Sequence, residues 1–70
     1  MTTHTYLNNK DISSIRLNDT VQSIFTYDKG SIEAIDVEND KLSIKWDGGH
    51  LSENIPREKL TKVIHLGRGQ

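Results

Sequence analysis

The stretch KGSIEAIDVENDKLSIKW, residues 29–46, contains the pattern that decides the fold. Its second half alternates apolar and polar side chains from Leu42 to Trp46, which is the period of a strand with one buried face. Asn39 and Asp40 precede this run, and both residue types tolerate the positive φ angles of a tight hairpin. We therefore expect two antiparallel strands joined by a two-residue turn at these positions.

The register that follows from this turn predicts a β-bulge. It places four apolar side chains on one face, in the pairs Val37 with Leu42 and Ile35 with Ile44. It also places Glu33 on that face, and a bulge near Glu33 and Ala34 would correct this by shifting the alternation. We expect the long strand, which opens at Gly30, to bend there.

Asp47 and the two glycines that follow it predict a second hairpin. A turn at the glycines pairs Trp46 with Leu51. The same ladder would set Glu53 on the apolar face, so we expect this strand to kink within residues 52–54. If either of the two misplaced glutamates proved buried and paired, it would mark a binding surface.

Flanking segments complete the expected sheet. Residues 20–27 supply its first strand, and the β-branched, apolar residues 61–66 supply its last. Pro56 has no N–H to donate, so it ends a strand and begins a single 3₁₀ turn that brings Leu60 onto the core. The expected fold class is all-β, a five-stranded, strongly bent antiparallel barrel.

The first eighteen residues allow two interpretations. Asp11 can cap one helical turn that carries Ile12 and Ile15 on one side, whereas an extended path through Ile15 and Leu17 is the alternative. Either form would strap an open end of the barrel or meet a partner. The expected organisation is an N-terminal extension over residues 1–18, the barrel over residues 19–66 and a flexible tail over residues 67–70.

Composition restricts the class of protein. The 70-residue chain has no cysteine, so it has neither a disulfide framework nor a thiolate metal site. Its apolar runs are shorter than the roughly 20 residues that cross a bilayer, and its N-terminus lacks the pattern of a signal peptide. We expect a cytoplasmic protein without membrane contact. The net charge of −1 provides no global field that would attract nucleic acid.

The order of these elements resembles the SH3-like small barrels of the Tudor and KOW type. The chain looks most similar to short uncharacterised bacterial and phage proteins with a V-x-W-D-x-G hairpin. The resemblance covers about two thirds of the chain and supports a fold better than a function. It is carried by the glycine before a strand at Gly30-Ser31-Ile32, by Ile35-Asp36, by Ile44-Lys45-Trp46-Asp47-Gly48, and by Ile55-Pro56 with Leu60.

The Tudor resemblance implies an aromatic cage between two loops. The matching positions here are Phe25, Tyr27, Trp46 and Asp47. Three rings and a carboxylate hold a cationic group by cation–π attraction, worth about 0.5 to 2 kcal/mol per contact. Trp46 shares a face with Leu42, however, so the alternative is that it is the largest residue of the core.

Catalytic chemistry has little support in this sequence. His4, His50 and His65 are scattered, and none has the short spacing to a second ligand that a metal site needs. No glycine-flanked nucleophile turn accompanies the serines. We therefore expect no enzyme activity, no metal and no cofactor.

Two kinds of partner remain. The leading hypothesis is a small accessory protein that docks on another protein or self-associates through a free sheet edge. The alternative, which the KOW resemblance implies, is nucleic-acid binding by the loop aromatics and by basic side chains. Acidic residues in the middle of the chain oppose a wide phosphate footprint. The basic candidates are Lys29, Lys45, Arg57, Lys59, Lys62 and Arg68.

Overall fold

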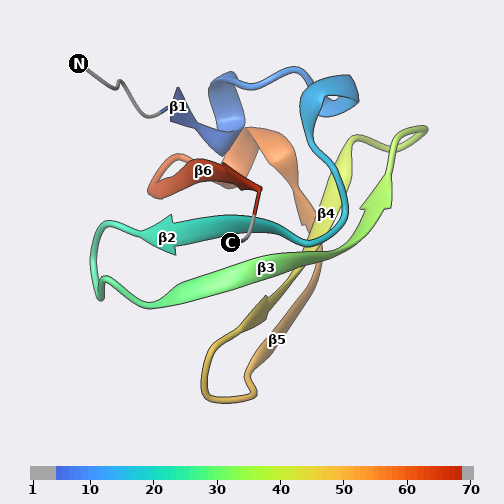
Figure 1. Cartoon of the computed structure of the whole chain (residues 1–70). Helices are drawn as coiled ribbons and strands as arrows, with labels where there is room; N and C mark the ends of the chain where they lie inside the picture. The colour runs from blue at the N-terminus through green and yellow to red at the C-terminus, as the bar shows by residue number, and fades with distance from the viewer. Residues whose placement is uncertain (1–4, 69–70) are drawn as a thin grey trace.

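The structure is a computed structural model that describes residues 5–68. Its strands form one antiparallel sheet (Figure 1). The sheet has six strands in the order β1-β6-β2-β3-β4-β5. Within the described residues no helix has the length and apolarity needed to cross a membrane. The strands are β1 Thr5–Tyr6, β2 Asp19–Ser23, β3 Lys29–Asp36, β4 Lys41–Trp46, β5 Leu51–Pro56 and β6 Val63–Arg68, and the 3₁₀ turns are η1 Leu7–Asn9, η2 Ile12–Ser14 and η3 Arg57–Lys59.

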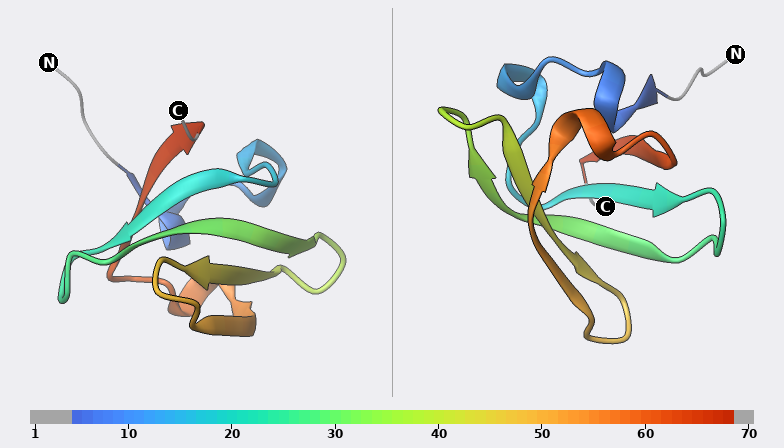
Figure 2. Two further views of the ribbon diagram at one scale, coloured as in Figure 1. Left: turned by 60° about the horizontal axis from the view of Figure 1, so that its bottom comes forward. Right: turned by 180° about the vertical axis from the view of Figure 1, so that it is seen from behind.

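The all-β antiparallel fold is confirmed, but the five-stranded barrel is not. The N-terminal extension supplies β1 as a sixth strand, which pairs with β6. The sheet also stays open, because β1 and β5 stand at its two ends with one neighbour each. Figure 2 shows how it curls, with the β2–β3 and β4–β5 hairpins diverging and the N-terminal segment lying across the opposite end.

The bulge predicted in β3 is confirmed. Ile32 pairs with Ile44 and Ala34 pairs with Ser43, so the register shifts at Glu33. This shift lets Ile32 and Ile44 share the core face, where each is almost fully buried. Glu33 is exposed, so it does not mark a buried polar site.

The predicted two-residue turn between β3 and β4 is wrong. Asp36 pairs with Lys41, which leaves residues 37–40 as a wider turn and Val37 63% exposed. The Asp36 carboxylate accepts hydrogen bonds from the backbone N–H of Asn39 at 3.1 Å and from its Nδ2 at 2.9 Å. These bonds stabilise the wider turn, and hydrogen bonding by Asn39 also lowers the pKa of Asp36.

The second hairpin also has a wider turn than predicted. Leu51 pairs with Lys45 rather than with Trp46, whose N–H donates to the His50 carbonyl oxygen at 2.7 Å. Gly48 and Gly49 have φ angles of 100° and 99°, a backbone conformation that residues other than glycine rarely adopt.

The kink predicted in β5 is present where it was expected. The register shifts between the Leu42–Ile55 pair and the Ile44–Ser52 pair. Asn54 in this segment has a positive φ of 54°, and its N–H donates to Ser43 Oγ at 3.0 Å. Glu53 remains exposed as a result, so it is not a buried, paired residue either.

The first and last strands that the sequence predicted begin or end at other residues in the structure. β2 ends at Ser23, so residues 24–28 form a loop instead of continuing the strand. The last strand starts later than expected and includes Gly67 and Arg68, which pair with Thr20 and Asp19. The predicted flexible tail therefore begins at least two residues too early, and Gly69 and Gln70 lie outside the described residues.

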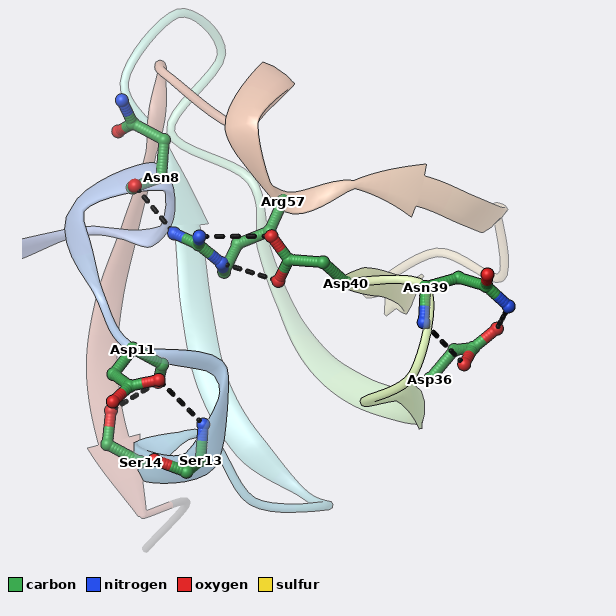
Figure 3. Close-up of polar contacts among 8 residues, drawn as sticks. All are labelled: Asn8, Asp11, Ser13, Ser14, Asp36, Asn39, Asp40 and Arg57. Atoms are coloured by element: carbon green, nitrogen blue, oxygen red, sulfur yellow. Dashed lines mark hydrogen bonds and ion pairs between the residues drawn. The ribbon is translucent and has the colours of Figure 1, made fainter.

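The N-terminal extension contains the capped turn that was one of its two interpretations. The Asp11 carboxylate accepts from the Ser13 N–H at 3.4 Å at the start of η2 (Figure 3). Ile15 then turns into the core and is 4% exposed, whereas Leu17 stays exposed. Leu7 in η1 is fully buried, so this segment covers one end of the sheet.

Arg57 fastens that segment to the sheet. Its guanidinium forms a two-pronged ion pair with Asp40, at 2.8 Å from Nε and 3.0 Å from a terminal nitrogen. Its other terminal nitrogen donates to the Asn8 carbonyl oxygen at 2.7 Å. Figure 3 shows these contacts of Arg57 with Asp40 and Asn8, which we call the Arg57 clasp, between η1, η3 and the β3–β4 turn. The hydrogen bonds with Asp40 raise the pKa of Arg57, which stays charged.

The core is made mainly of aliphatic side chains from most of the elements. One glycine, Gly30, has close neighbours that leave no room for a side chain. A Cβ on Gly30 would lie 2.8 Å from the Lys45 carbonyl oxygen and 2.9 Å from Cε3 of Trp46. The indole therefore packs directly on the backbone of β3. Members of the core are Leu7, Ile15, Val21, Ile32, Leu42, Ile44, Leu60 and Val63, with Ile12, Ile35, Trp46 and Ile55 partly buried against them.

A buried polar pair joins β2 to β6. Asp19 Oδ2 lies 2.8 Å from Nε2 of His65 and also accepts from the Arg16 N–H at 2.9 Å. Burial raises the pKa of Asp19, but the hydrogen bonds from His65 and Arg16 and their charges outweigh it, so the pKa lies below its ordinary value. The pair sits beside the bulge between Thr20 and Val21.

Replacing Gly30 with alanine should destabilise the fold. A methyl group at this position meets backbone and the indole, so we expect the free energy of unfolding to fall by about 1 to 3 kcal/mol. Urea unfolding followed by Trp46 fluorescence measures this loss. Ser31→Ala, at the neighbouring position of β3, should change the midpoint much less. Equal midpoints for Gly30→Ala and the unsubstituted protein would contradict the packing described.

Replacing Asp19 with asparagine should weaken the fold in a pH-dependent way. At pH 7 we expect a loss of about 1.5 to 3 kcal/mol, the range for hydrogen bonds to charged groups. Because the folded state lowers the pKa of Asp19, this stability is present above the aspartate pKa of about 4 and disappears as the pH falls further. Urea unfolding between about pH 7 and pH 2 should show the gap between the two proteins narrowing. A constant gap would be the contrary result.

Candidate binding site

A pocket of about 260 Å³ opens between the β2–β3 loop and the β4–β5 hairpin end. Both segments lie away from the N-terminal extension, as Figures 1 and 2 show. These are the two loops between which the Tudor resemblance implied an aromatic cage. The pocket is lined by Ser23, Thr26 and Asp28 from the first segment and by Trp46, Asp47 and His50 from the second.

Trp46 belongs both to the core and to the pocket. One part of the indole packs on Gly30 and the core, while another part lines the pocket wall. Its Nε1 donates to Ser52 Oγ at 3.0 Å, which satisfies the only polar atom of the ring and fixes its orientation. Trp46 therefore packs against the core, as one of the two alternatives held, and it also lines a pocket whose lining does not include the other two rings of the expected cage.

Backbone hydrogen bonds fix the hairpin end and join it to β3. The Asp47 N–H donates to the Lys29 carbonyl oxygen at 2.8 Å, which links the hairpin end to the start of β3. The Gly49 N–H donates to the Trp46 carbonyl oxygen at 3.0 Å within the hairpin. The hairpin end is thus attached to β3, the strand that follows the loop of the other wall.

Ser23 organises the other wall. Its Oγ accepts hydrogen bonds from the N–H groups of Phe25 at 3.2 Å and Thr26 at 3.4 Å. Its backbone accepts from the Tyr27 N–H and donates to the Asp28 carbonyl oxygen, both at 2.9 Å. Four bonds from one residue hold the loop of residues 24–28 in a defined conformation.

Phe25 and Tyr27 do not line the pocket. They are 72% and 73% exposed, and they project from the loop that forms one pocket wall. The sequence treated them as alternate residues of a strand, but β2 ends at Ser23, so that alternation does not apply. Tyr27 has a φ of 63°, a strained conformation for a bulky residue, and Gln22 Nε2 donates to its carbonyl oxygen at 3.0 Å.

The pocket is acidic. Asp28 and Asp47 both line it, and within residues 5–68 neither forms an ion pair. His50 is the remaining titratable group of the lining and is exposed. The sequence indicated Trp46 and Asp47 but not Asp28 or His50. His50 follows the predicted glycine turn, and Asp28 lies between the first two predicted strands.

The basic residues considered for nucleic acid come from β3, β4, η3, β6 and the segment before β6. Arg57 is committed to its bonds with Asp40 and Asn8. The Nζ of Lys62 lies over the Phe25 ring, 5.8 Å from its centroid. The side chain of Arg68 lies outside the described part of the chain. Three further lysines are exposed on three different elements: Lys29 on β3, Lys45 on β4 and Lys59 in η3.

Metal-binding groups do not come together in residues 5–68. No three histidine, aspartate or glutamate side chains in that part of the chain are placed to hold an ion. His65 is engaged with Asp19, and His50 lies in the pocket. His4 lies outside the described residues.

Comparison with models of protein families, with curated proteins and with solved structures finds no match for this chain. Functional inference therefore depends on the pocket itself, on its charge and on the exposed rings beside it.

Replacing Ser23 with alanine should loosen the loop while leaving the sheet folded. The substitution removes the acceptor of two backbone N–H groups, so we expect a loss of about 1 kcal/mol in unfolding free energy. Amide hydrogen exchange should become faster at Phe25 and Thr26 than in the unsubstituted protein. Ser23→Thr keeps the hydroxyl and is the matched control. Unchanged exchange at both amides in Ser23→Ala would show that the hydroxyl does not order the loop.

Proposed function

We propose that this chain is a non-catalytic binding module that docks on another protein through one face. This docking face consists of the β2–β3 loop, residues 24–28, and the hairpin end, residues 46–50. The observation that carries the proposal is an acidic pocket with an indole wall beside two exposed aromatic rings on an ordered loop. Ordering a loop before binding reduces the entropy lost on association.

The pocket suits a cationic side chain of the partner. Asp28 and Asp47 supply negative charge without an ion pair among the described residues, and Trp46 supplies a π surface. A lysine or arginine at such a surface gains roughly 0.5 to 1 kcal/mol from an exposed cation–π contact alone. A volume of about 260 Å³ accommodates one side chain rather than a folded element.

The fold supports the same proposal. We propose an SH3-like relationship of the Tudor type, because β2 to β6 follow one another with a 3₁₀ turn immediately before the last strand. The pocket between the first loop and the third hairpin of such a domain is where the resemblance implied a ligand site. The N-terminal extension covers the other end of the sheet, which leaves the docking face accessible.

Docking by this face is a better supported mode than self-association through the sheet edge. The long free edge is β5, and it carries a register shift opposite β4, the exposed Glu53 and a terminal Pro56. Bulges, charges and prolines are the features by which proteins protect edges from pairing. Self-association by strand pairing therefore has less support than docking on a different protein.

Single-stranded nucleic acid is the second candidate. The observation in its favour is Lys62 above the exposed ring of Phe25, with Tyr27 nearby in sequence, because exposed rings and lysines bind bases and phosphates. The carboxylates of Asp28 and Asp47 would repel phosphates at the same face.

NMR titration tests the proposal. The probes are the peptides Ac-Ala-Lys-Ala-NH₂ and Ac-Ala-Arg-Ala-NH₂, with Ac-Ala-Gln-Ala-NH₂ as the neutral control. We expect the basic peptides to shift the amides of Thr26, Asp28 and Asp47 and the indole N–H of Trp46, and we expect added salt to weaken the effect. Asp47→Asn should weaken binding several-fold, roughly the effect of one exposed charge pair.

Glu38→Gln is the matched control, because Glu38 is exposed on the β3–β4 turn and its substitution changes the net charge by the same amount. Equal shifts with the neutral peptide, or no shifts at the pocket with any peptide, would refute the proposal. An oligothymidine that shifts the same face at low salt, when the basic peptides do not, would favour the nucleic-acid alternative.

A further inference from the structure

Two charge centres of opposite sign lie beside the β2–β3 loop of the docking face. Asp28 and Asp47 make the pocket acidic, and the Lys62 ammonium lies over the Phe25 ring, 5.8 Å from its centroid. Phe25 is next in sequence to Thr26, which lines the pocket. The β2–β3 loop therefore lines the acidic pocket at Thr26 and Asp28, and its Phe25 ring lies beneath the Lys62 ammonium.

Lys62 is tied to this loop through its backbone as well as its side chain. Its carbonyl oxygen accepts a hydrogen bond from the Ile24 N–H at 2.9 Å, which joins the residues before β6 to the start of the loop. The Phe25 N–H is itself held by Ser23 Oγ. The backbone of the residue beneath the ammonium is thus held by Ser23.

The two centres do not neutralise one another. Within residues 5–68 the ion pairs are Arg57 with Asp40 and His65 with Asp19, so neither Lys62 nor the pocket carboxylates take part in one. A partner can meet both centres only with complementary charges in a matching order. A uniformly basic segment would be repelled by Lys62, and a uniformly acidic one by Asp28 and Asp47.

We infer that the partner is a protein segment that places a basic side chain in the pocket and, a short distance along the chain, an acidic side chain against Lys62. This inference rests on the proposed function, since it assigns the second contact of the same face. Its basis is the charge complementarity that the separated, unpaired centres require. Lys62 then acts as a specificity residue that selects mixed-charge segments over purely basic ones.

A peptide series with variable spacing tests the inference. The probes are Ac-Arg-(Gly)ₙ-Asp-NH₂ with spacers of about one to four glycines, which cover a reach of roughly 3.5 Å per residue. Each is compared with the peptide that has asparagine in place of aspartate. Titration is followed by Trp46 fluorescence, because Trp46 is the single tryptophan and lines the pocket.

We expect the aspartate peptide to bind about two- to fivefold more tightly at one or two spacer lengths, the gain of an exposed ion pair. Lys62→Gln should abolish this preference, Lys62→Arg should retain it, and Lys45→Gln should leave it unchanged. Lys45 is the matched control because it is an exposed lysine on β4 outside the pocket lining.

Three results would contradict the inference. Equal affinity of the aspartate and asparagine peptides at every spacer length would overturn the inference while leaving the proposed pocket intact. A preference that survives Lys62→Gln would also overturn it. Binding of neither peptide would refute the proposed function and the inference together. The urea midpoint of Lys62→Gln is the control for folding: an unchanged midpoint would show that a lost preference does not come from a lost fold.

Discussion

The contact between the Trp46 indole and the backbone of Gly30 is the constraint on which the candidate site depends. Absence of a side chain at Gly30 lets the Trp46 ring lie against the backbone of β3. The bond from the indole to Ser52 then fixes the orientation of the ring. Because the same ring lines the pocket, the packing of the core determines the shape of the binding surface.

The two ends of the sheet have different roles. At one end, Leu7 and Ile15 fill the core, and the Arg57 clasp attaches the N-terminal extension where the sheet itself stays open. The extension thus combines the pairing of β1 with β6 and the burial of apolar side chains, which adds to the core of a small chain that has no disulfides. At the other end, two ordered turns leave aromatic and acidic groups exposed, as a surface for recognition requires.

Alternation along the strands predicted those features that burial alone decides. The bulge at Glu33 and the kink before Ile55 follow because a glutamate on the core face has no partner there. The wider turn after Asp36 was missed because side-chain hydrogen bonds with Asn39 select it, and alternation contains no information on such bonds. The Tudor resemblance implied a cage between these two loops, and only Trp46 and Asp47 of its four residues line the pocket. Asp28 and His50 join the lining only through tertiary structure.

Our central claim is that the docking face is preformed in the free protein, with the loop of residues 24–28 held by Ser23 and the hairpin end held by Trp46. Backbone ¹⁵N relaxation of the unliganded protein tests this most directly. We predict order parameters for the amides of residues 24–28 and 47–50 close to those of the strands, about 0.85. Values below about 0.6 in these two segments would contradict the claim.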